Sequence, residues 1–260
     1  DRRTIEEIGI PGLVLMERSA LGAVQALGEY LPDDRVGRIG ILCGAGNNGG
    51  DGIAMARMLD GSGYDPMIVL VSSPDSLSSD ASSQLDVARE LELDVVDVSD
   101  VDAEELDAHL ESLPRCLLWV DALLGTGIDR PVEGSYARAI AFLNRRALVF
   151  SVDIPSGVHG ESGQIMGTAV RADVTATFGA VKLGQVVDPG RTRCGDLRSV
   201  DIGIPLIVQR EVGFEGVLLD SEWTFLRMSP REEDTHKGDS GKLLILAGSH
   251  EKTGAALLAA

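Results

Sequence analysis

Short apolar runs alternate with stretches of helical periodicity along most of this chain. Thr4 to Tyr30 carries apolar residues at helical spacing and is interrupted at Pro11. Beyond it, β-branched and apolar runs predict strands, and amphipathic stretches predict helices between them. The predicted strands are 36–43, 67–71, 93–98, 116–120, 147–152, 174–178 and 197–202, and the predicted helices are 52–59, one that ends at 91, 104–110 and 135–144.

This alternation predicts an α/β fold. A strand, a helix and a second strand in succession favour parallel pairing, because the chain must cross over the sheet between the strands. We therefore expect a Rossmann-like, doubly wound, mainly parallel sheet with helices on both faces, from about residue 30 to residue 210. A glycine-rich turn at 44–50 and a Ser- and Asp-rich loop at 72–83 punctuate the pattern.

The pattern changes after Pro205. Residues 206–240 have mixed charges and a weaker apolar pattern, then 242–247 predicts a buried strand, Gly248–Ser249 a turn and 253–260 the start of a helix. A strand and half a helix cannot bury their own apolar faces. We therefore interpret residues 1–216 as one domain, clipped at its start because the sequence opens without an initiator methionine, and 217–260 as the start of an incomplete second domain.

The charge balance narrows the class of partner. Twenty-three Lys and Arg residues against 41 Asp and Glu residues give a formal net charge of −18, which repels phosphate backbones and anionic lipids. The sequence therefore predicts no nucleic-acid partner and no membrane partner. Cys43, Cys116 and Cys194 are widely spaced without a CxxC pair, which argues against a disulfide framework and a zinc site and favours a reducing, cytoplasmic location.

The first predicted strand runs into a glycine-rich turn, Gly44 to Gly52. The glycines let the backbone approach a ligand closely, and the start of the following helix offers unpaired N–H groups to an anion such as a pyrophosphate. A dehydrogenase would place a carboxylate at the end of the second strand, which here ends in serines. Asn47, Asn48 and Asp51 instead gather oxygens in the turn, although Asp51 as a helix cap is the structural alternative.

Two further predicted strands end in a carboxylate followed by a glycine turn. Asp121 ends one strand, and Asp153 and Ser156 follow another. Ligands of open α/β sheets bind at the carboxyl ends of the strands. If these strands are neighbours, Asn48, Asp121 and Ser156 encircle one cation; each aspartate is otherwise a structural cap of its turn.

Lys182 follows another predicted strand end and is one of four lysines in the sequence. A lysine at this edge of the sheet is suited to a phosphate contact or a proton transfer. A solvated surface lysine is the structural alternative, and the sequence leaves both open.

Together these segments resemble the NAD(P)H-hydrate epimerase family, the N-terminal domain of the bifunctional nicotinamide-nucleotide repair enzyme. The resemblance extends from the first residues to about 205 and is carried by 8–18, 47–52, 121–127 and 152–157, in order, with the Lys182 strand after them. It implies an isomerase that interconverts the R and S epimers of hydrated NADH or NADPH in metabolite repair, and a homo-oligomer, a dimer.

The same resemblance implies the residues of the site. For the hydrated dinucleotide they are Asn47, Asn48, Gly49, Gly50, Asp51, Gly125, Thr126, Gly127, Ile128, Asp129, Arg130, Pro131 and Asp153. For a potassium ion they are Asn48, Asp121 and Ser156, which agrees with the oxygen clustering at the strand ends. Tyr136 is expected to border the pocket.

The tail resembles the start of the partner domain, the ADP/ATP-dependent NAD(P)H-hydrate dehydratase of ribokinase-like fold. Residues 236–241, 246–249 and 253–256 carry this resemblance. The glycine-rich nucleotide site of that domain is not in this sequence. Lyase activity is therefore expected only of a full-length, bifunctional parent.

The implied reaction inverts C6 of the hydrated nicotinamide ring. Loss of hydroxide through an iminium, or ring opening and reclosure, requires a general acid and a general base. We expect Asp153 to be this group, with Lys182 as the second candidate. A non-catalytic binding or scaffold module and an NAD-dependent dehydrogenase are the alternatives, and fold alone does not decide between them.

Overall fold

A computed structural model describes residues 1–31, 37–213, 216–219, 221–228, 244–249 and 254–259. The chain forms two compact units, Asp1–Val212 and Gly213–Ala260, and the predicted boundary at residue 216 lies a few residues beyond this division. In the first unit the strands are β1 Arg38–Cys43, β2 Asp65–Leu70, β3 Asp94–Asp97, β4 Leu118–Ala122, β5 Val149–Val152, β6 Val174–Phe178 and β7 Asp196–Val200.

The helices of the first unit connect these strands. They are α1 Arg2–Glu6, α2 Gly12–Gly28, α3 Asn47–Gly61, α4 Ser79–Glu90, α5 Ala103–Ser112, α6 Gly134–Leu143, α7 Leu183–Val186 and α8 Leu206–Val212, with short 3-10 turns at Pro74–Ser76 and Gly190–Arg193. The second unit contributes α9 Ser221–Phe225 and α10 Gly254–Ala259. None of the helices in the described part of the chain is long and apolar enough to cross a membrane.

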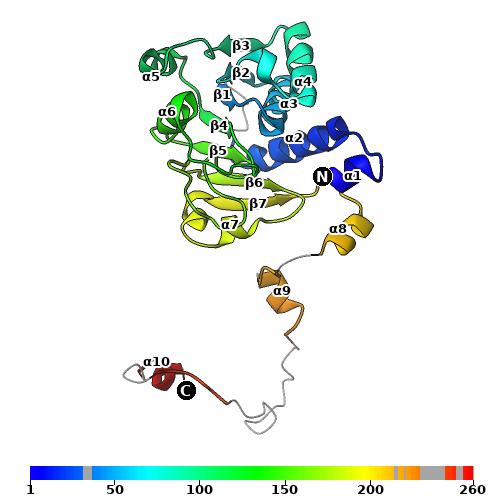
Figure 1. Cartoon of the computed structure of the whole chain (residues 1–260), viewed down its shortest axis with the longest axis vertical. Coiled ribbons are helices and arrows are strands. Elements are labelled where there is room, and N and C mark those ends of the chain that lie inside the picture. The colour runs from blue at the N-terminus through cyan, green and yellow to red at the C-terminus, as the bar shows by residue number, and fades with distance from the viewer. Residues whose placement is uncertain (32–36, 214–215, 220, 229–243, 250–253, 260) are drawn as a thin grey trace. The chain divides into compact units, whose positions relative to one another are not determined.

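The seven strands form one parallel sheet in the order β3-β2-β1-β4-β5-β6-β7 (Figure 1). This confirms the predicted fold class. From β1 the chain proceeds outward to β2 and β3, and from β4 it proceeds the opposite way to β5, β6 and β7. The strand order therefore reverses between β1 and β4, and open α/β sheets bind ligands in the crevice that this reversal leaves at the carboxyl ends.

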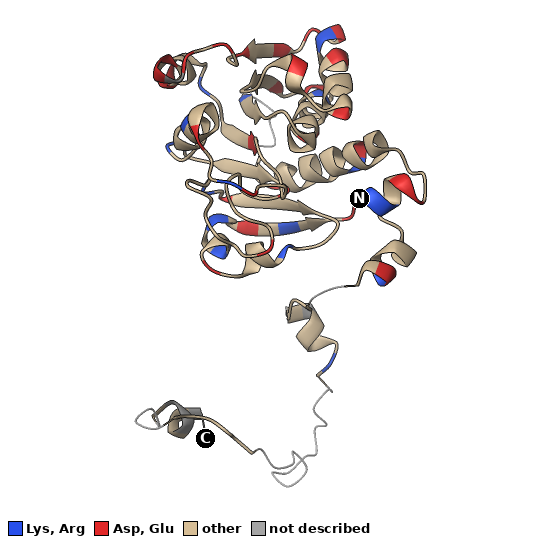
Figure 2. Cartoon of the chain, viewed as in Figure 1, with Lys and Arg blue, Asp and Glu red and all other residues tan. Residues whose placement is uncertain are grey.

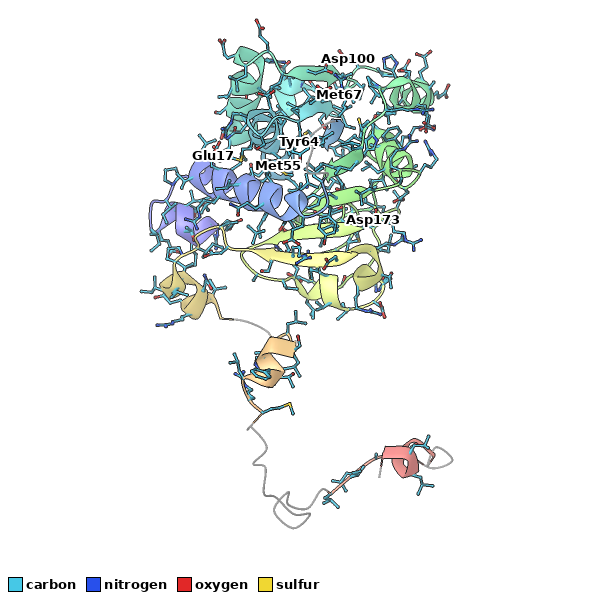
Figure 3. The ribbon with its side chains drawn as sticks, turned by 180° about the vertical axis from the view of Figure 1, so that it is seen from behind. Glu17, Met55, Tyr64, Met67, Asp100 and Asp173 are labelled. Carbon is cyan, nitrogen blue, oxygen red and sulfur yellow. The ribbon has the colours of Figure 1, made fainter. Side chains whose placement is uncertain are left out.

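Apolar side chains cover both faces of the sheet, because successive residues of a strand point to opposite sides. Ile39 and Ile41 of β1 pack with α2, α3 and α4 in one core, whereas Leu42 packs with α5 and α6 in the other. Met55 of α3 and Met67 of β2, both labelled in Figure 3, belong to these two different cores. The two-sided burial accounts for the nearly continuous apolar strands of the sequence.

Acidic residues concentrate away from the middle of the sheet. Asp and Glu gather on α4 and α5, whereas α2 is largely uncharged (Figure 2). Helix α2, which packs beside β6 and β7, therefore contributes little to the acidic surface.

Strand bounds such as those of β1, β4 and β5 differ from the prediction by two residues, and two boundaries in the first unit are wrong by more. Helix α3 begins at Asn47 instead of residue 52, inside the expected glycine-rich turn. The expected loop 72–83 ends at Ser78, whose hydroxyl accepts a hydrogen bond from the Ala81 N–H and so caps α4. In both places a polar, turn-like sequence forms the first turn of a helix because its neighbours or its cap stabilise that turn.

The strand predicted at 242–247 is also wrong where the structure describes it. Residues 244–247 are not in a strand, and Leu244 and Leu246 are 80% and 88% exposed. A strand needs a neighbour to pair its backbone groups, and the second unit contains no other strand among its described residues. The predicted helix is present as α10, while His236 to Gly241 lie outside the described residues.

We expect Gly44→Ala to lower the free energy of unfolding by about 3 kcal/mol, because the added carbon must displace backbone. An ideal Cβ at Gly44 would lie 1.9 Å from the carbonyl oxygen of Leu123. This close approach brings the turn after β1 against the turn after β4. Urea unfolding followed by circular dichroism measures the change. Gly46→Ala is the matched control: its Cβ meets nothing within 4 Å, so a loss below about 1 kcal/mol is expected. Equal effects of the two substitutions would contradict the close approach.

Candidate functional site

A cleft of about 680 Å³ lies at the carboxyl ends of β1 and β4, where the strand order reverses. Its lining brings together residues from several segments that are distant in sequence. Those that the sequence analysis singled out are Asn47, Asn48, Asp51, Gly125, Thr126, Gly127, Ile128, Asp153 and Lys182. The remaining lining comes mainly from α1 and α2, from Asp80 of α4, and from the segments after β6 and β7.

The N-terminus of α3 opens on this cleft. Gly46 is the N-cap residue in extended conformation, and no side chain caps the helix. The first N–H groups of an α-helix have no partner within the helix, and they carry the positive end of its dipole. Because Gly46, Asn47 and Asn48 line the cleft, this end of α3 is suited to bind an anionic group of a ligand.

Gly49 and Gly50 lie behind the cleft surface rather than along it. A Cβ at Gly49 would lie 1.9 Å from the carbonyl oxygen of Gly44, and one at Gly50 would lie 2.5 Å from the methyl carbon of Met16. These two glycines allow α3 to start against the β1 turn and α2. Their predicted contact with a dinucleotide stays a prediction.

Asn48 is buried without satisfied polar groups. The residue is 7% exposed, and among the described residues neither its Oδ1 nor its Nδ2 has a hydrogen-bond partner. An unpartnered buried amide is costly, so such a group commonly has a ligand or water as its partner. Its side chain lies against Gly125, where an ideal Cβ would be 3.9 Å from Asn48 Oδ1.

Asp121 at the end of β4 is fully buried and accepts hydrogen bonds on both oxygens. Ser156 Oγ donates to Oδ1 at 2.6 Å, while Ser151 Oγ and the Ser156 N–H donate to Oδ2 at 2.7 and 2.9 Å. The Leu123 N–H adds a longer contact of 3.4 Å to Oδ1. Burial raises the pKa of Asp121, and the hydrogen bonds lower it in part. No described Lys or Arg side chain contributes to this pKa shift.

Ser156 connects Asp121 to the segment next to Asn48. Its Oγ accepts the Leu124 N–H at 2.8 Å and lies 3.1 Å from the Leu124 carbonyl oxygen. The structure therefore joins Asp121 and Ser156 directly, and it brings Asn48 to the adjacent Gly125.

Asp153 and Lys182 form an ion pair at the other side of the cleft. Lys182 Nζ donates to Asp153 Oδ1 at 2.5 Å, to Thr177 Oγ1 at 2.8 Å and to the Phe178 carbonyl at 2.9 Å. An ammonium has three N–H donors, so all of them are used. Asp153 Oδ1 also accepts the Phe178 N–H, whereas no described residue donates to its Oδ2.

The backbone at Asp153 is in the left-handed region, with φ of +64°. Non-glycine residues rarely adopt this conformation, and such outliers concentrate at functional sites. Gln185 stabilises this conformation. Its side-chain Nε2 donates to the backbone carbonyl of Asp153 at 2.7 Å, and its Oε1 accepts the backbone N–H of Lys182.

Asp51 of α3 faces the same cleft. The residue is 8% exposed, and no described residue donates a hydrogen bond to its carboxyl group. Burial raises the pKa of Asp51 well above its ordinary value; the negative charge of Asp153 raises it further and Lys182 lowers it. The helix-cap alternative for Asp51 does not hold, since α3 starts at Asn47 and has no side-chain cap.

The loop after β4 enters the cleft only in part. Gly125 to Ile128 line it, whereas Asp129, Arg130 and Pro131 are exposed and lie outside its lining. Tyr136 does not line it either. Its hydroxyl accepts the Ala45 N–H at 3.1 Å and lies 2.6 Å from Ser72 Oγ, so it fixes the glycine turn from behind.

Helix α2 supplies a wall that the sequence analysis interpreted only as an apolar stripe. Leu15, Met16 and Ser19 line the cleft. Glu17, labelled in Figure 3, holds this helix in place: it accepts hydrogen bonds from Arg57 of α3 at 2.5 Å and from Gln84 of α4 at 2.8 Å. The helical spacing of these residues identified the helix but not which of its apolar positions face a ligand.

Thr177 and Gln185 were also missed. Both bind the Asp153–Lys182 pair through side chains. The one sequence signal for Gln185 is its place three residues after Lys182, from which a glutamine side chain can accept the backbone N–H of a residue that precedes a helix, as it does here.

Comparison with known proteins adds the family relationship. A family model described as YjeF-related protein N-terminus matches residues 12–184. The bifunctional NAD(P)H-hydrate repair enzyme Nnr of Thermofilum pendens is 39% identical over 263 residues, which cover 99% of this chain and 48% of the relative. The NAD(P)H-hydrate epimerase of Limosilactobacillus fermentum is 39% identical over 196 residues, which cover 75% of this chain and 88% of the relative.

The extent of these matches differs between the two kinds of relative. The Nnr enzyme of Salinibacter ruber is 37% identical, and the match covers all of this chain but 50% of the relative. The chain thus spans about half the length of the bifunctional relatives. A crystal structure of yeast ynu0 matches with a TM-score of 0.67 at 21% identity, covering 85% of this chain and 91% of that one, which supports the fold.

We expect Asp121→Asn to lower the free energy of unfolding by about 2 kcal/mol, because an amide nitrogen would replace an acceptor and meet the buried donors of Ser151 and Ser156. Urea unfolding measures this. Asp60→Asn, at the exposed end of α3, should change the stability by less than about 0.5 kcal/mol. A neutral effect of Asp121→Asn would mean that the network does not hold the turn after β4.

Proposed function

The chain belongs to the YjeF-related protein N-terminus family, and on that premise we propose that it is an NAD(P)H-hydrate epimerase. It interconverts the R and S epimers of hydrated NADH and NADPH, and so contributes to repair of damaged nicotinamide nucleotides. The observation that carries the proposal is one cleft that contains both the uncapped start of α3 and the Asp153–Lys182 pair. A dinucleotide needs the first for its pyrophosphate and the second for its reacting ring.

Asp153 is the proposed acid–base residue. Its Oδ1 is held by Lys182 and by the Phe178 N–H, which leaves Oδ2 free to meet the substrate oxygen. When the hydroxyl on C6 leaves, the ring nitrogen's electron pair forms an iminium and the oxygen takes a proton; water then returns to C6 and gives up a proton. Lys182 has no donor left for the substrate, so we assign it the positioning of Asp153 instead of the proton transfer.

The rest of the predicted dinucleotide site follows the same cleft. Asn47, Asn48 and the first turn of α3 bind the pyrophosphate, and Gly125 to Ile128 border the nucleotide. The exposed residues Asp129, Arg130 and Pro131 extend this border outside the cleft. Gly49 and Gly50 act through the helix start that they make possible.

Potassium is the proposed cofactor, held by Asn48, Asp121 and Ser156. The donor set fits a hard cation: the buried Asn48 amide oxygen lacks a partner, and the Asp121 carboxylate is buried without a cationic side chain. When bound, the ion supplies positive charge that offsets the carboxylate and the phosphates of the substrate. Such charge matters on a chain with a formal net charge of −18.

The two alternatives are less well supported. A dehydrogenase requires a ribose-binding carboxylate after β2, where Ser72 instead contacts Tyr136. A scaffold module does not require an unpartnered buried Asn48, or a carboxylate in a left-handed conformation held by a fully bonded lysine.

The remaining parts of the proposal concern the whole protein. We infer a bifunctional parent with an ADP/ATP-dependent dehydratase, supported by the match of this chain to half of each Nnr relative. The free cysteines Cys43, Cys116 and Cys194 support a cytoplasmic location, and the family resemblance supports a homodimer. Neither nucleic acid nor a membrane is proposed as a partner.

The first experiment mixes the protein with the pure R epimer of hydrated NADH in potassium buffer and separates R and S by chromatography. We expect the epimer mixture to form faster than in the buffer control, because the site supplies an acid–base group. Replacing potassium by sodium should slow the reaction. A folded sample without acceleration would exclude the epimerase, and equal rates in both salts would exclude the cation site alone.

We expect Asp153→Asn to lower kcat by about 100-fold or more with KM changed less than about threefold, since general acid–base catalysis contributes about 10²–10⁴-fold. Asparagine tolerates a positive φ, so the backbone should stay in place. Glu92→Gln is the control, because Glu92 is the other described non-glycine residue with a positive φ and lies outside the cleft. A fully active Asp153→Asn enzyme with unchanged substrate binding would rule out this role.

A further inference from the structure

Inversion at C6 requires proton transfer on both faces of the ring. The oxygen leaves from one face and returns to the other, so one carboxyl group reaches only half of the reaction directly. If the proposed epimerase function is correct, the cleft should contain a second group that exchanges protons. Besides Asp153, which reaches the cleft from the end of β5, the described lining contains Asp1, Asp51 and Asp80. Of these three, Asp51 of α3 is the buried one.

The surroundings of Asp51 differ from those of Asp121 and Asp153. Asp121 accepts four hydrogen bonds, and Asp153 is held by Lys182 and the Phe178 N–H. Asp51 is 8% exposed and receives no hydrogen bond from the described residues. A carboxylate that is largely buried and receives no hydrogen bond from the protein loses part of its hydration, so the neutral acid is favoured.

The charges around Asp51 reinforce this difference. Asp153 disfavours a second negative charge in the cleft, and Lys182 offsets it only in part because it is already paired with Asp153. Among the other charged groups on the elements packed against α3, Asp80 on α4 lines the cleft, Glu17 on α2 is paired with Arg57, and Asp121 on β4 is hydrogen-bonded. The remaining ones, Arg18, Arg38, Asp65, Asp86, Arg89 and Glu90, do not line the cleft. Two carboxyl groups that share a site in this way are driven into different protonation states.

We propose that Asp51 is a second catalytic residue, which exchanges a proton with the C6 oxygen on the face of the ring opposite to Asp153. In one direction the Asp51 acid gives its proton to the departing hydroxyl. The C6–O bond breaks, the ring nitrogen forms the iminium and water is released, leaving Asp51 as a carboxylate.

The second half of the cycle restores both groups. Water attacks C6 from the other face, a new C6–O bond forms, and Asp153 takes the proton of the attacking water. A proton then passes from Asp153 to Asp51 through water in the cleft. The opposite epimer uses the two residues in exchanged roles, so atoms and charge balance in both directions without a further reactant.

The pH dependence of the wild-type enzyme tests this assignment first. Because the donating form of Asp51 is the neutral acid, kcat/KM for the R epimer should fall as the pH rises through the raised pKa of Asp51. The rate is measured from the R-to-S conversion, with the buffer rate at each pH subtracted. A wild-type profile without a decline on the alkaline side would overturn the proposal.

The Asp51→Asn variant supplies the second test. We expect kcat to fall by about 100-fold or more, KM to change less than about threefold, and the alkaline decline to disappear from the residual activity. Asp60→Asn, the same substitution at the exposed end of the same helix, should keep the wild-type rate and profile. Circular dichroism and thermal unfolding verify that the variants are folded.

The outcomes separate this proposal from the proposed function. An active wild-type enzyme whose Asp51→Asn variant keeps its rate and its alkaline decline refutes the role of Asp51 and leaves the epimerase intact. A wild-type protein without activity refutes the epimerase itself. If Asp51→Asn does not fold, the wild-type pH profile still decides, because it requires no variant.

Discussion

The buried carboxylate of Asp121 organises the carboxyl edge of the sheet. It lies one residue before the end of β4 and accepts hydrogen bonds from the segments that follow both β4 and β5. The two turns are therefore bonded to the same carboxyl group. Through Ser156 and Leu124 this connection extends to Gly125, which lies against the unpartnered amide of Asn48. The Gly44 turn is fixed on the same edge by its contact with Leu123. The positions of the cleft walls thus depend on the hydrogen bonds of one fully buried carboxyl group.

Charge also determines how such a cleft can accept an anionic nucleotide. Its described lining contains four aspartates but a single lysine, and that lysine is already bound to Asp153. Arginine or lysine side chains therefore do not supply the attraction. The uncapped start of α3 supplies it through backbone dipoles, and the proposed cation at Asn48 would add an exchangeable positive charge. A site of this kind attracts phosphate without a permanently basic surface, in keeping with the acidic exterior shown in Figure 2.

The sequence predicted the sheet more accurately than the site. Strand β6 has the predicted bounds, because a short run rich in β-branched residues in a buried strand has few alternatives. The early start of α3 was missed because Asn and Gly have poor helix propensity, and only the close packing of Gly49 on Gly44 allows a helix there. The strand ends identified Asp121 and Asp153 as polar groups of one edge. The three hydrogen bonds of Lys182 were not predictable, since the sequence does not show that Asp153, Thr177 and Phe178 lie within reach of its nitrogen.

The bonding of Lys182 has a practical consequence for handling the protein. It is the only lysine between residues 1 and 212, and the other three lie between residues 237 and 252. An ammonium that donates three hydrogen bonds and is 21% exposed is a poor nucleophile toward amine-directed reagents. Activated esters should therefore acylate Lys182 slowly, because its nitrogen must first release Asp153, Thr177 and Phe178. The rate of amine labelling at this one position thus reports how often the ion pair of the cleft opens.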